Sequence, residues 1–131
     1  MTGIDTNVLV RFLVGDDPAQ ESRAVALFAR ANAAGEKLFV PQIVVCELAW
    51  VLSYAYDKSR SEIAAGLSTL LRARQLTFEE VDQIQTALER FAAGHGDLAD
   101  WLIWERSRAA GAERVATFDG RLLRSPEFVE V

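Results

Sequence analysis

Four carboxylic acids stand in sequence surroundings where an isolated carboxylate is costly. Glu47 is the only polar residue in the run 43–52, and Asp100 is the only charged residue in the run 98–104. Asp5 and Asp119 each follow a short apolar segment that resembles the end of a strand. An ionised carboxylate without a partner in a protein core costs several kcal/mol. We therefore expect Glu47 to have a partner and the four acids to act together.

The chemistry open to such a group of acids follows from what can neutralise it. The chain has only two lysines, Lys37 and Lys58, so arginine or a metal ion must balance the charge. Gathered carboxylates raise one another's pKa unless a cation holds them together, and an all-oxygen site suits Mg²⁺ or Mn²⁺. Such an ion lowers the pKa of a bound water and stabilises charge at a phosphodiester. The acids thus indicate metal-dependent phosphodiester hydrolysis.

Each acid also has a purely structural interpretation. Glu47 can pair with an arginine, Asp5 and Asp97 can be helix N-caps, and Asp119 can open an Asp-Gly turn. Taken together, the acids favour the metal site over these separate roles. Zinc is disfavoured because the one histidine, His95, lies between two glycines without a second ligand at a suitable spacing. We interpret His95 as a solvated loop residue.

The elements that must position these acids can be read from caps and hydrophobic periodicity. The four-residue pattern of a capping box occurs at residues 59–62 and again at 77–80, and each is expected to open a helix. Strands are expected at residues 1–4, 38–40, 114–118 and 128–131, and helices after Asp5, over 18–35, over 43–56, after 59, after 77 and over 98–110. Strands separated by helices favour a parallel sheet covered on both faces, with Asp5 and Asp119 at the edge where such sheets bind ligands.

Composition limits the alternatives. The chain has 131 residues, half of them hydrophobic and a quarter charged, which predicts a single domain over residues 1–131 and excludes a disordered chain. One cysteine, Cys46, permits no intrachain disulfide and fits a reducing compartment. No apolar run approaches the ~20 residues that span a bilayer, and no secretory leader is recognisable, so we expect a cytoplasmic protein that does not enter membranes.

The net charge of −5 argues against binding nucleic acid through overall positive potential. If four of the 19 acids belong to one site, 15 remain against 14 basic residues, so the rest of the protein is nearly neutral. The acidity is then local. With divalent ions bound, such a site engages a phosphodiester instead of repelling it.

Four motifs in order resemble those of PIN-domain proteins, and most closely the VapC-type toxins of bacterial toxin–antitoxin pairs. They are Asp-Thr-Asn-Val-Leu-Val at residues 5–10, Glu-Leu at 47–48, Asp-Leu-Ala-Asp-Trp-Leu-Ile at 97–103 and Thr-Phe-Asp at 117–119. No single motif is specific, but the ordered set is, and it covers nearly the whole chain. The resemblance implies a three-layer α/β/α sandwich on a central parallel sheet and a Mg²⁺- or Mn²⁺-dependent endoribonuclease.

The resemblance also implies roles for individual residues. The metal-binding and catalytic acids would be Asp5, Glu47, Asp100 and Asp119, with Asp97 either an outer ligand or only a helix cap. The residues supporting them would be Thr6, Asn7 and Thr117. Among the scattered basic residues, Arg11 and Arg121 are the best candidates to contact RNA phosphates, since both lie close in sequence to proposed ligands.

Partners follow from the same resemblance. VapC-like proteins are typically homodimers neutralised by a small VapB-like antitoxin, whose basic segment an acidic groove would attract. Trp101 and Trp104 depart from the small residues usual in this helix of the family, and they either fill the core or dimer interface or stack against a base.

Other functions remain open on the sequence. They are a PIN-like nuclease of RNA processing or DNA repair without an antitoxin, and a non-catalytic module that binds RNA or a partner. A phosphoaspartate phosphatase and a signalling receiver are disfavoured, because Asn7 stands where a phosphatase would have a second acid, the adjacent N-terminal acids of a receiver are missing, and no lysine lies near a late strand.

Overall fold

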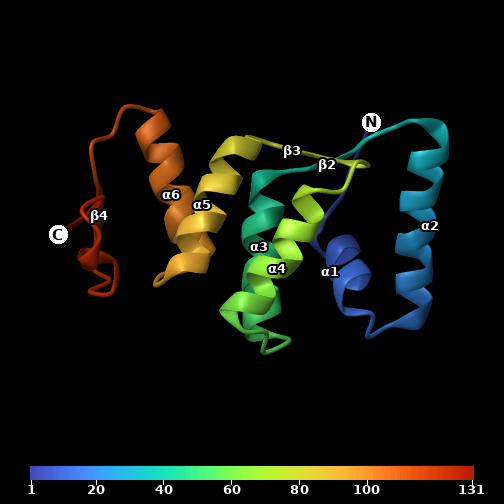
Figure 1. Cartoon of the computed structure of the whole chain (residues 1–131), viewed down its shortest axis with the longest axis horizontal. Coiled ribbons are helices and arrows are strands. Elements are labelled where there is room, and N and C mark those ends of the chain that lie inside the picture. Colours follow the sequence, from blue (N-terminus) through green and yellow to red (C-terminus); the bar gives the residue numbers. More distant parts are fainter. The chain divides into compact units, whose positions relative to one another are not determined.

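The computed structural model describes residues 1–131 as two compact units, unit 1 over residues 1–81 and unit 2 over residues 82–131. Figure 1 shows the helices and strands along the chain. Unit 1 contains β1 (Thr2–Gly3), α1 (Thr6–Val14), α2 (Pro18–Ala34), β2 (Leu38–Val40), α3 (Gln42–Tyr54), α4 (Arg60–Leu71) and β3 (Leu76–Phe78). Helix α5 (Val81–Ala93) begins at the last residue of unit 1 and lies otherwise in unit 2. Unit 2 also contains α6 (Leu98–Ala109), β4 (Val115–Thr117), the short 3₁₀ helix η1 (Leu122–Arg124) and β5 (Phe128–Glu130).

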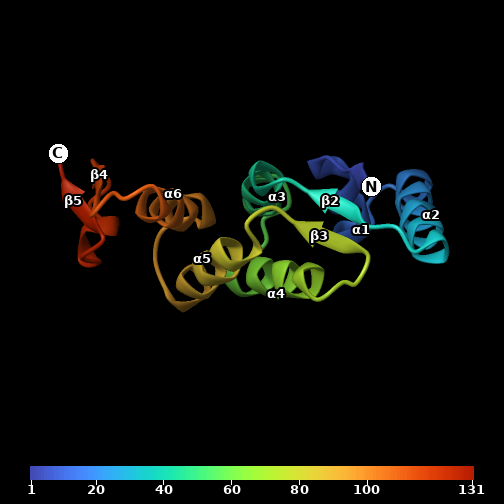
Figure 2. The same ribbon diagram turned by 90° about the horizontal axis from the view of Figure 1, so that it is seen from above.

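All the strands pair in parallel, which confirms the predicted α/β class. In unit 1 the strand order is β1-β2-β3, and Figure 2 shows β2 and β3 side by side. In unit 2, β4 pairs with β5. Thr2 is opposite Leu38, Leu38 is opposite Leu76, and Val115 is opposite Phe128. The parallel strands are thus distributed over two sheets, one in each unit.

The segment 76–80 is where the structure departs from the predicted elements. The expected capping box at 77–80 is wrong, because Thr77 lies within β3 and α5 begins only at Val81. Pairing with β2 buries Leu76 and satisfies the backbone of this segment, which a local cap would not do. Glu79 instead caps another helix: its Oε1 accepts from the backbone N–H of Gln42 at 2.8 Å. That contact supplies the acceptor that the preceding Pro41 lacks at the start of α3.

The other caps form largely as their sequences predict. Ser59 and Glu62 make a complete capping box at the start of α4. Asp17 accepts from the backbone N–H of Gln20 at the start of α2, which ends at Gly35 with φ +67°. The Gln20 side chain does not return to Asp17, since its Oε1 accepts from Nε of Arg11 at 2.6 Å. The tertiary contact with Arg11 thus takes the place of a bond from the Gln20 side chain back to the cap residue.

Each unit has its own core. In unit 1, α1 packs against α2 and α3, and α3 packs against α4, around fully buried residues such as Leu9, Leu38, Val40 and Leu48. In unit 2 the centre is Trp101, which is 1% exposed and whose ring meets Phe128 edge-on at 5.3 Å. None of the helices combines the length and the apolar character needed to cross a membrane.

His95 belongs to the core region of unit 2, so its interpretation as a solvated loop residue is wrong. It is half-buried, its Nε2 lies 2.9 Å from Oγ of the buried Ser125, and its ring meets that of Trp101 edge-on. Its carbonyl oxygen also accepts from Nε1 of Trp101 at 3.0 Å. Although His95 lies between two glycines, its contacts with Trp101 and Ser125 hold it at the core of unit 2.

A polar network joins the end of α1 to the segment after α3. Arg11 donates from Nη1 to Asp16 and to the Tyr56 hydroxyl, each at 2.9 Å, and the Tyr56 hydroxyl donates to Asp16 at 2.8 Å. The Arg11 guanidinium and this hydroxyl hold the pKa of Asp16 below its ordinary range. Arg11 therefore connects three segments of unit 1.

We expect the Tyr56→Phe variant to lower the free energy of unfolding by about 1 kcal/mol, because it removes a hydroxyl that both accepts and donates a hydrogen bond. Urea denaturation followed by circular dichroism measures the change. Tyr54→Phe is the matched control, since Tyr54 is 67% exposed and its hydroxyl makes no hydrogen bond, and its effect should stay within about 0.5 kcal/mol. Equal midpoints for the two variants would show that the network does not stabilise the fold.

Candidate active site

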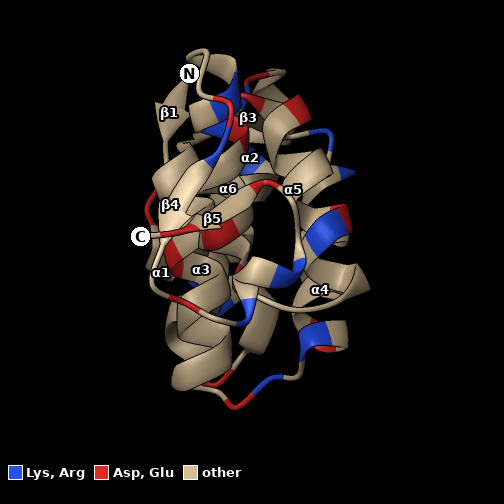
Figure 3. Cartoon of the chain, turned by 90° about the vertical axis from the view of Figure 1, so that its left-hand side faces the viewer, with Lys and Arg blue, Asp and Glu red and all other residues tan.

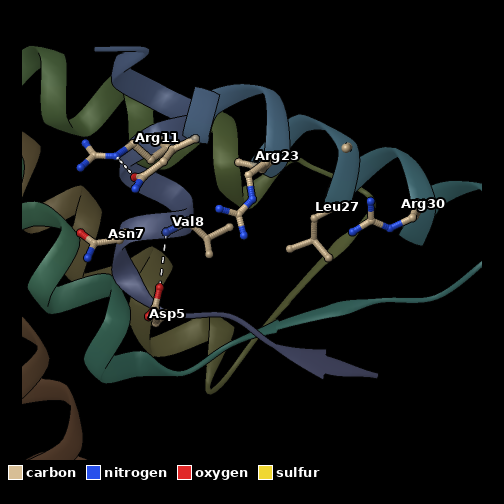
Figure 4. Close-up of a pocket in the computed structure, with 10 residues that line it drawn as sticks. Asp5, Asn7, Val8, Arg11, Arg23, Leu27 and Arg30 are labelled. Atoms are coloured by element: carbon tan, nitrogen blue, oxygen red, sulfur yellow. Dashed lines mark hydrogen bonds between the residues drawn. The ribbon is translucent and has the colours of Figure 1, made fainter. Parts of the chain in front are cut away.

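Asp5 is fixed at the junction of β1 and α1. The strand pairing continues to Ile4, whose N–H donates to the carbonyl of Phe39 at 2.9 Å. Asp5 then adopts extended backbone, and its Oδ1 accepts from the N–H of Val8 at 3.4 Å, as Figure 4 shows. The side chain is exposed and its second oxygen makes no hydrogen bond. The N-cap and ligand interpretations of Asp5 are therefore compatible, because the cap uses only one oxygen.

The two residues after Asp5 differ in exposure. Thr6 is buried, with 4% of its surface exposed. Asn7 is exposed and lines the same pocket as Asp5. Of Thr6 and Asn7, only Asn7 thus presents an exposed polar side chain in the pocket that Asp5 lines.

Glu47 lies on the exposed side of α3, so the expectation that it lies partly in the core and has a partner is wrong. It forms no ion pair, and it shares a helix face with Ile43, Trp50 and Tyr54, which are 75%, 59% and 67% exposed. The helical period of 3.6 residues places these positions opposite the buried Leu48. The apolar run 43–52 is therefore buried on one side only.

In unit 2, Asp100 lies in the first turn of α6 and is half-buried. Its Oδ2 accepts from the backbone N–H of Asp97 at 2.7 Å. Burial raises the pKa of Asp100, and the charges of Asp97 and Asp119 raise it further. The carboxyl thus sits in a negative field, which a bound cation would relieve.

Asp119 follows β4 and is held on several sides. Its N–H donates to Oγ1 of Thr117 at 3.0 Å, and its Oδ1 accepts from the N–H of Arg121 at 2.9 Å. The Arg121 guanidinium donates to both carboxylate oxygens, at 3.1 Å to Oδ1 and 2.7 Å to Oδ2. This fork lowers the pKa of Asp119 to about 2 and raises that of Arg121. Arg121 thus fixes the orientation of the carboxylate, and Thr117 fixes the backbone of Asp119.

The structure brings some of the predicted site residues together. In unit 2, Asp97, Asp100, Asp119 and Arg121 form one electrostatically coupled group. Asp5 and Glu47 belong to unit 1, on helices that pack against one another. Within neither unit do three His, Cys, Asp or Glu side chains gather closely enough to hold a metal ion. The convergence of all four acids stays a prediction.

The two arginines expected to contact RNA are already occupied. Arg11 binds Asp16, Gln20 and Tyr56, and Arg121 binds Asp119. Figure 3 shows basic and acidic segments interspersed along the chain.

Two other basic residues line the same pocket as Asp5. A pocket of about 390 Å³ between α1 and α2 is lined by Asp5, Asn7, Arg23 and Arg30 (Figure 4). Arg23 and Arg30 were not among the basic residues expected to contact RNA. The sequence does carry a signal for them, because no acid lies three or four residues from either arginine, so neither has an ion-pair partner on its own helix.

Comparison with known proteins reveals two similarities. Residues 4–127 match the family model described as PIN domain. The chain is also 30% identical, over 118 residues, to a protein of Aquifex aeolicus (strain VF5) named VapC ribonuclease. That alignment covers 90% of this chain and 87% of the relative.

We expect Arg121→Gln to raise the pKa of Asp119 from about 2 toward its ordinary value of 3.8, because the guanidinium fork favours the charged carboxylate. Correspondingly, the pair stabilises the folded chain above pH 3.8 and loses that effect as the pH falls toward about 2. Carboxyl carbon chemical shifts of labelled Asp, recorded by NMR over an acid titration, measure this pKa. Arg124→Gln, an exposed change in η1, is the control that should leave Asp119 unaltered. An unchanged Asp119 titration in Arg121→Gln would contradict the assignment.

Proposed function

The chain belongs to the PIN-domain family, and we propose that it is a Mg²⁺- or Mn²⁺-dependent endoribonuclease, the toxin of a VapBC-type toxin–antitoxin pair. One observation carries the proposal: the charge of Asp119 acts on Asp100, so two of the predicted acids lie near one another, in a chain that resembles VapC ribonuclease over nearly its full length. A family match over residues 4–127 supports one nuclease domain spanning both units.

The donor chemistry fits a hard divalent ion. Asp5, Glu47, Asp100 and Asp119 offer only carboxylate oxygens, the ligands that Mg²⁺ and Mn²⁺ prefer. Burial, together with the charges of Asp97 and Asp119, raises the pKa of Asp100, and a divalent cation bound there would favour its ionised form. We propose that these four residues hold the ion, with Asp97 outside them. When bound, such an ion supplies an activated water and stabilises negative charge on the phosphodiester.

The chain's own residues prepare this site. The N–H of Val8 orients Asp5, and the N–H of Asp97 holds one oxygen of Asp100. Thr117 anchors the backbone of Asp119. Arg121 keeps Asp119 ionised and places a positive charge beside the acidic group of unit 2. Asp5, Asp100 and Asp119 are thus pre-oriented, which lowers the reorganisation required when substrate binds.

We also propose the partners that accompany this activity. The net charge of −5 and the acidic group of unit 2 favour a basic antitoxin segment on electrostatic grounds. A homodimer is expected from the resemblance to VapC proteins.

Purified protein should cleave single-stranded RNA in the presence of Mg²⁺ or Mn²⁺, and EDTA should abolish cleavage. Asp5→Asn and Asp100→Asn should each lower the cleavage rate by about 100-fold or more, since even residues that only support metal ligands typically contribute 10–100-fold. Gel analysis of a labelled RNA measures the rate.

Asp57→Asn is the matched control. Asp57 is exposed, lies outside the proposed site and has φ +52°, a conformation that Asn also tolerates. Its rate should equal that of the wild type. Cleavage that persists in EDTA, or full activity in Asp100→Asn, would refute the metal mechanism. Absence of RNA cleavage with either ion would favour a non-catalytic module.

A further inference from the structure

The pocket between α1 and α2 has a composition unusual for a protein with excess acid. It is formed entirely within unit 1, and its volume of about 390 Å³ falls within the roughly 300–1,000 Å³ of small-molecule sites. Three arginines line it against one acid, Asp5. Figure 4 shows Arg23 and Arg30 extending from α2, with Leu27 between them and Asp5 at the start of α1.

The two α2 arginines are available to a ligand. Both are exposed, and neither forms an ion pair with an acid of this chain. Arg11, the third arginine, is already bound by Asp16 and Tyr56. A pocket that holds two uncompensated guanidinium groups attracts an anion, and guanidinium matches phosphate in geometry.

The spacing of the arginines limits what the anion can be. Arg23 and Arg30 are seven residues apart, two helical turns or about 10 Å along the axis of α2. They are therefore placed to engage two separate phosphates rather than one. The half-buried Leu27 between them offers an apolar surface for a sugar or a base.

We propose that the groove between α1 and α2 binds a single strand of RNA, with Arg23 and Arg30 on successive phosphates and the strand leading to Asp5. This inference rests on the proposed function, since it gives that reaction its substrate path. It explains how a chain with net charge −5 holds a polyanion. Two phosphate contacts are supplied locally, at the end of the groove where an acid of the proposed site stands.

Salt dependence of binding tests the proposal. Binding of a short fluorescent single-stranded RNA is measured by anisotropy in EDTA, where cleavage is not expected, at several KCl concentrations. Each phosphate contact on a single strand contributes about 0.7 to the slope of log affinity against log salt, so Arg23→Gln/Arg30→Gln should flatten the slope by about 1.4. The Arg23→Lys/Arg30→Lys variant keeps both charges and should retain a slope near that of the wild type.

Arg72→Gln/Arg74→Gln is the matched control, because it removes the same charge from exposed positions of unit 1 outside the pocket. Its slope should change less than that of the groove variant. Circular dichroism checks that each variant folds. Equal slopes for the two Gln pairs, in a wild-type protein that cleaves RNA with Mg²⁺, would overturn the groove while leaving the proposed function intact. A wild type that neither binds nor cleaves RNA would overturn both, and would leave the groove to a protein partner.

Discussion

Acids placed beside one another raise each other's pKa unless a cation lies close by, and this electrostatic constraint acts on the acidic group of unit 2. The pKa values of Asp100 and Asp119 are shifted in opposite directions. Burial and neighbouring acids raise the pKa of Asp100, while the Arg121 fork lowers that of Asp119 to about 2. The same group therefore contains one carboxyl whose pKa is raised and one whose pKa is lowered. Arg121 is the cation that the chain itself supplies, and a divalent ion is the one that the donor set would accept in addition.

Parallel strand pairing decides where such acids stand. Asp5 follows β1, Glu79 follows β3 and Asp119 follows β4, each just past the carboxyl end of its strand. The three acids are used differently: Glu79 caps α3, Asp5 caps α1 with one oxygen, and Asp119 is held by Arg121. A helix cap and a metal ligand are thus related uses of the same position. Whether a capping carboxylate can also bind a metal depends on how many of its oxygens accept a hydrogen bond in the cap.

The arginines divide in a corresponding way. Arg11 and Arg121 are committed to acids and build the structure around them. Arg23 and Arg30 are not, and they lie in a pocket that Asp5 shares. A chain with more acids than bases can therefore still present local positive charge. Overall charge describes long-range steering of a ligand, whereas a few unpaired guanidinium groups decide where a phosphate is held.

Patterns of neighbouring residues were enough to predict the parallel α/β class, most helix boundaries and the ordered acidic motifs that indicate the family. Caps such as Ser59 with Glu62, and terminators such as Gly35, act over a few residues and are therefore visible in a linear pattern. Local patterns could not show that residues 76–78 form a strand, that Glu47 is exposed or that His95 packs on Trp101. They also could not show that Arg23 and Arg30 form no ion pair while Arg11 is bound. Those outcomes depend on the pairing of β3 with β2, on which side of α3 packs into the core, and on the hydrogen bond between Arg11 and Tyr56, which are 45 residues apart in the sequence. Contacts between distant residues outweigh local preference because they satisfy buried backbone groups and remove apolar surface from water, which no pattern of neighbouring residues encodes.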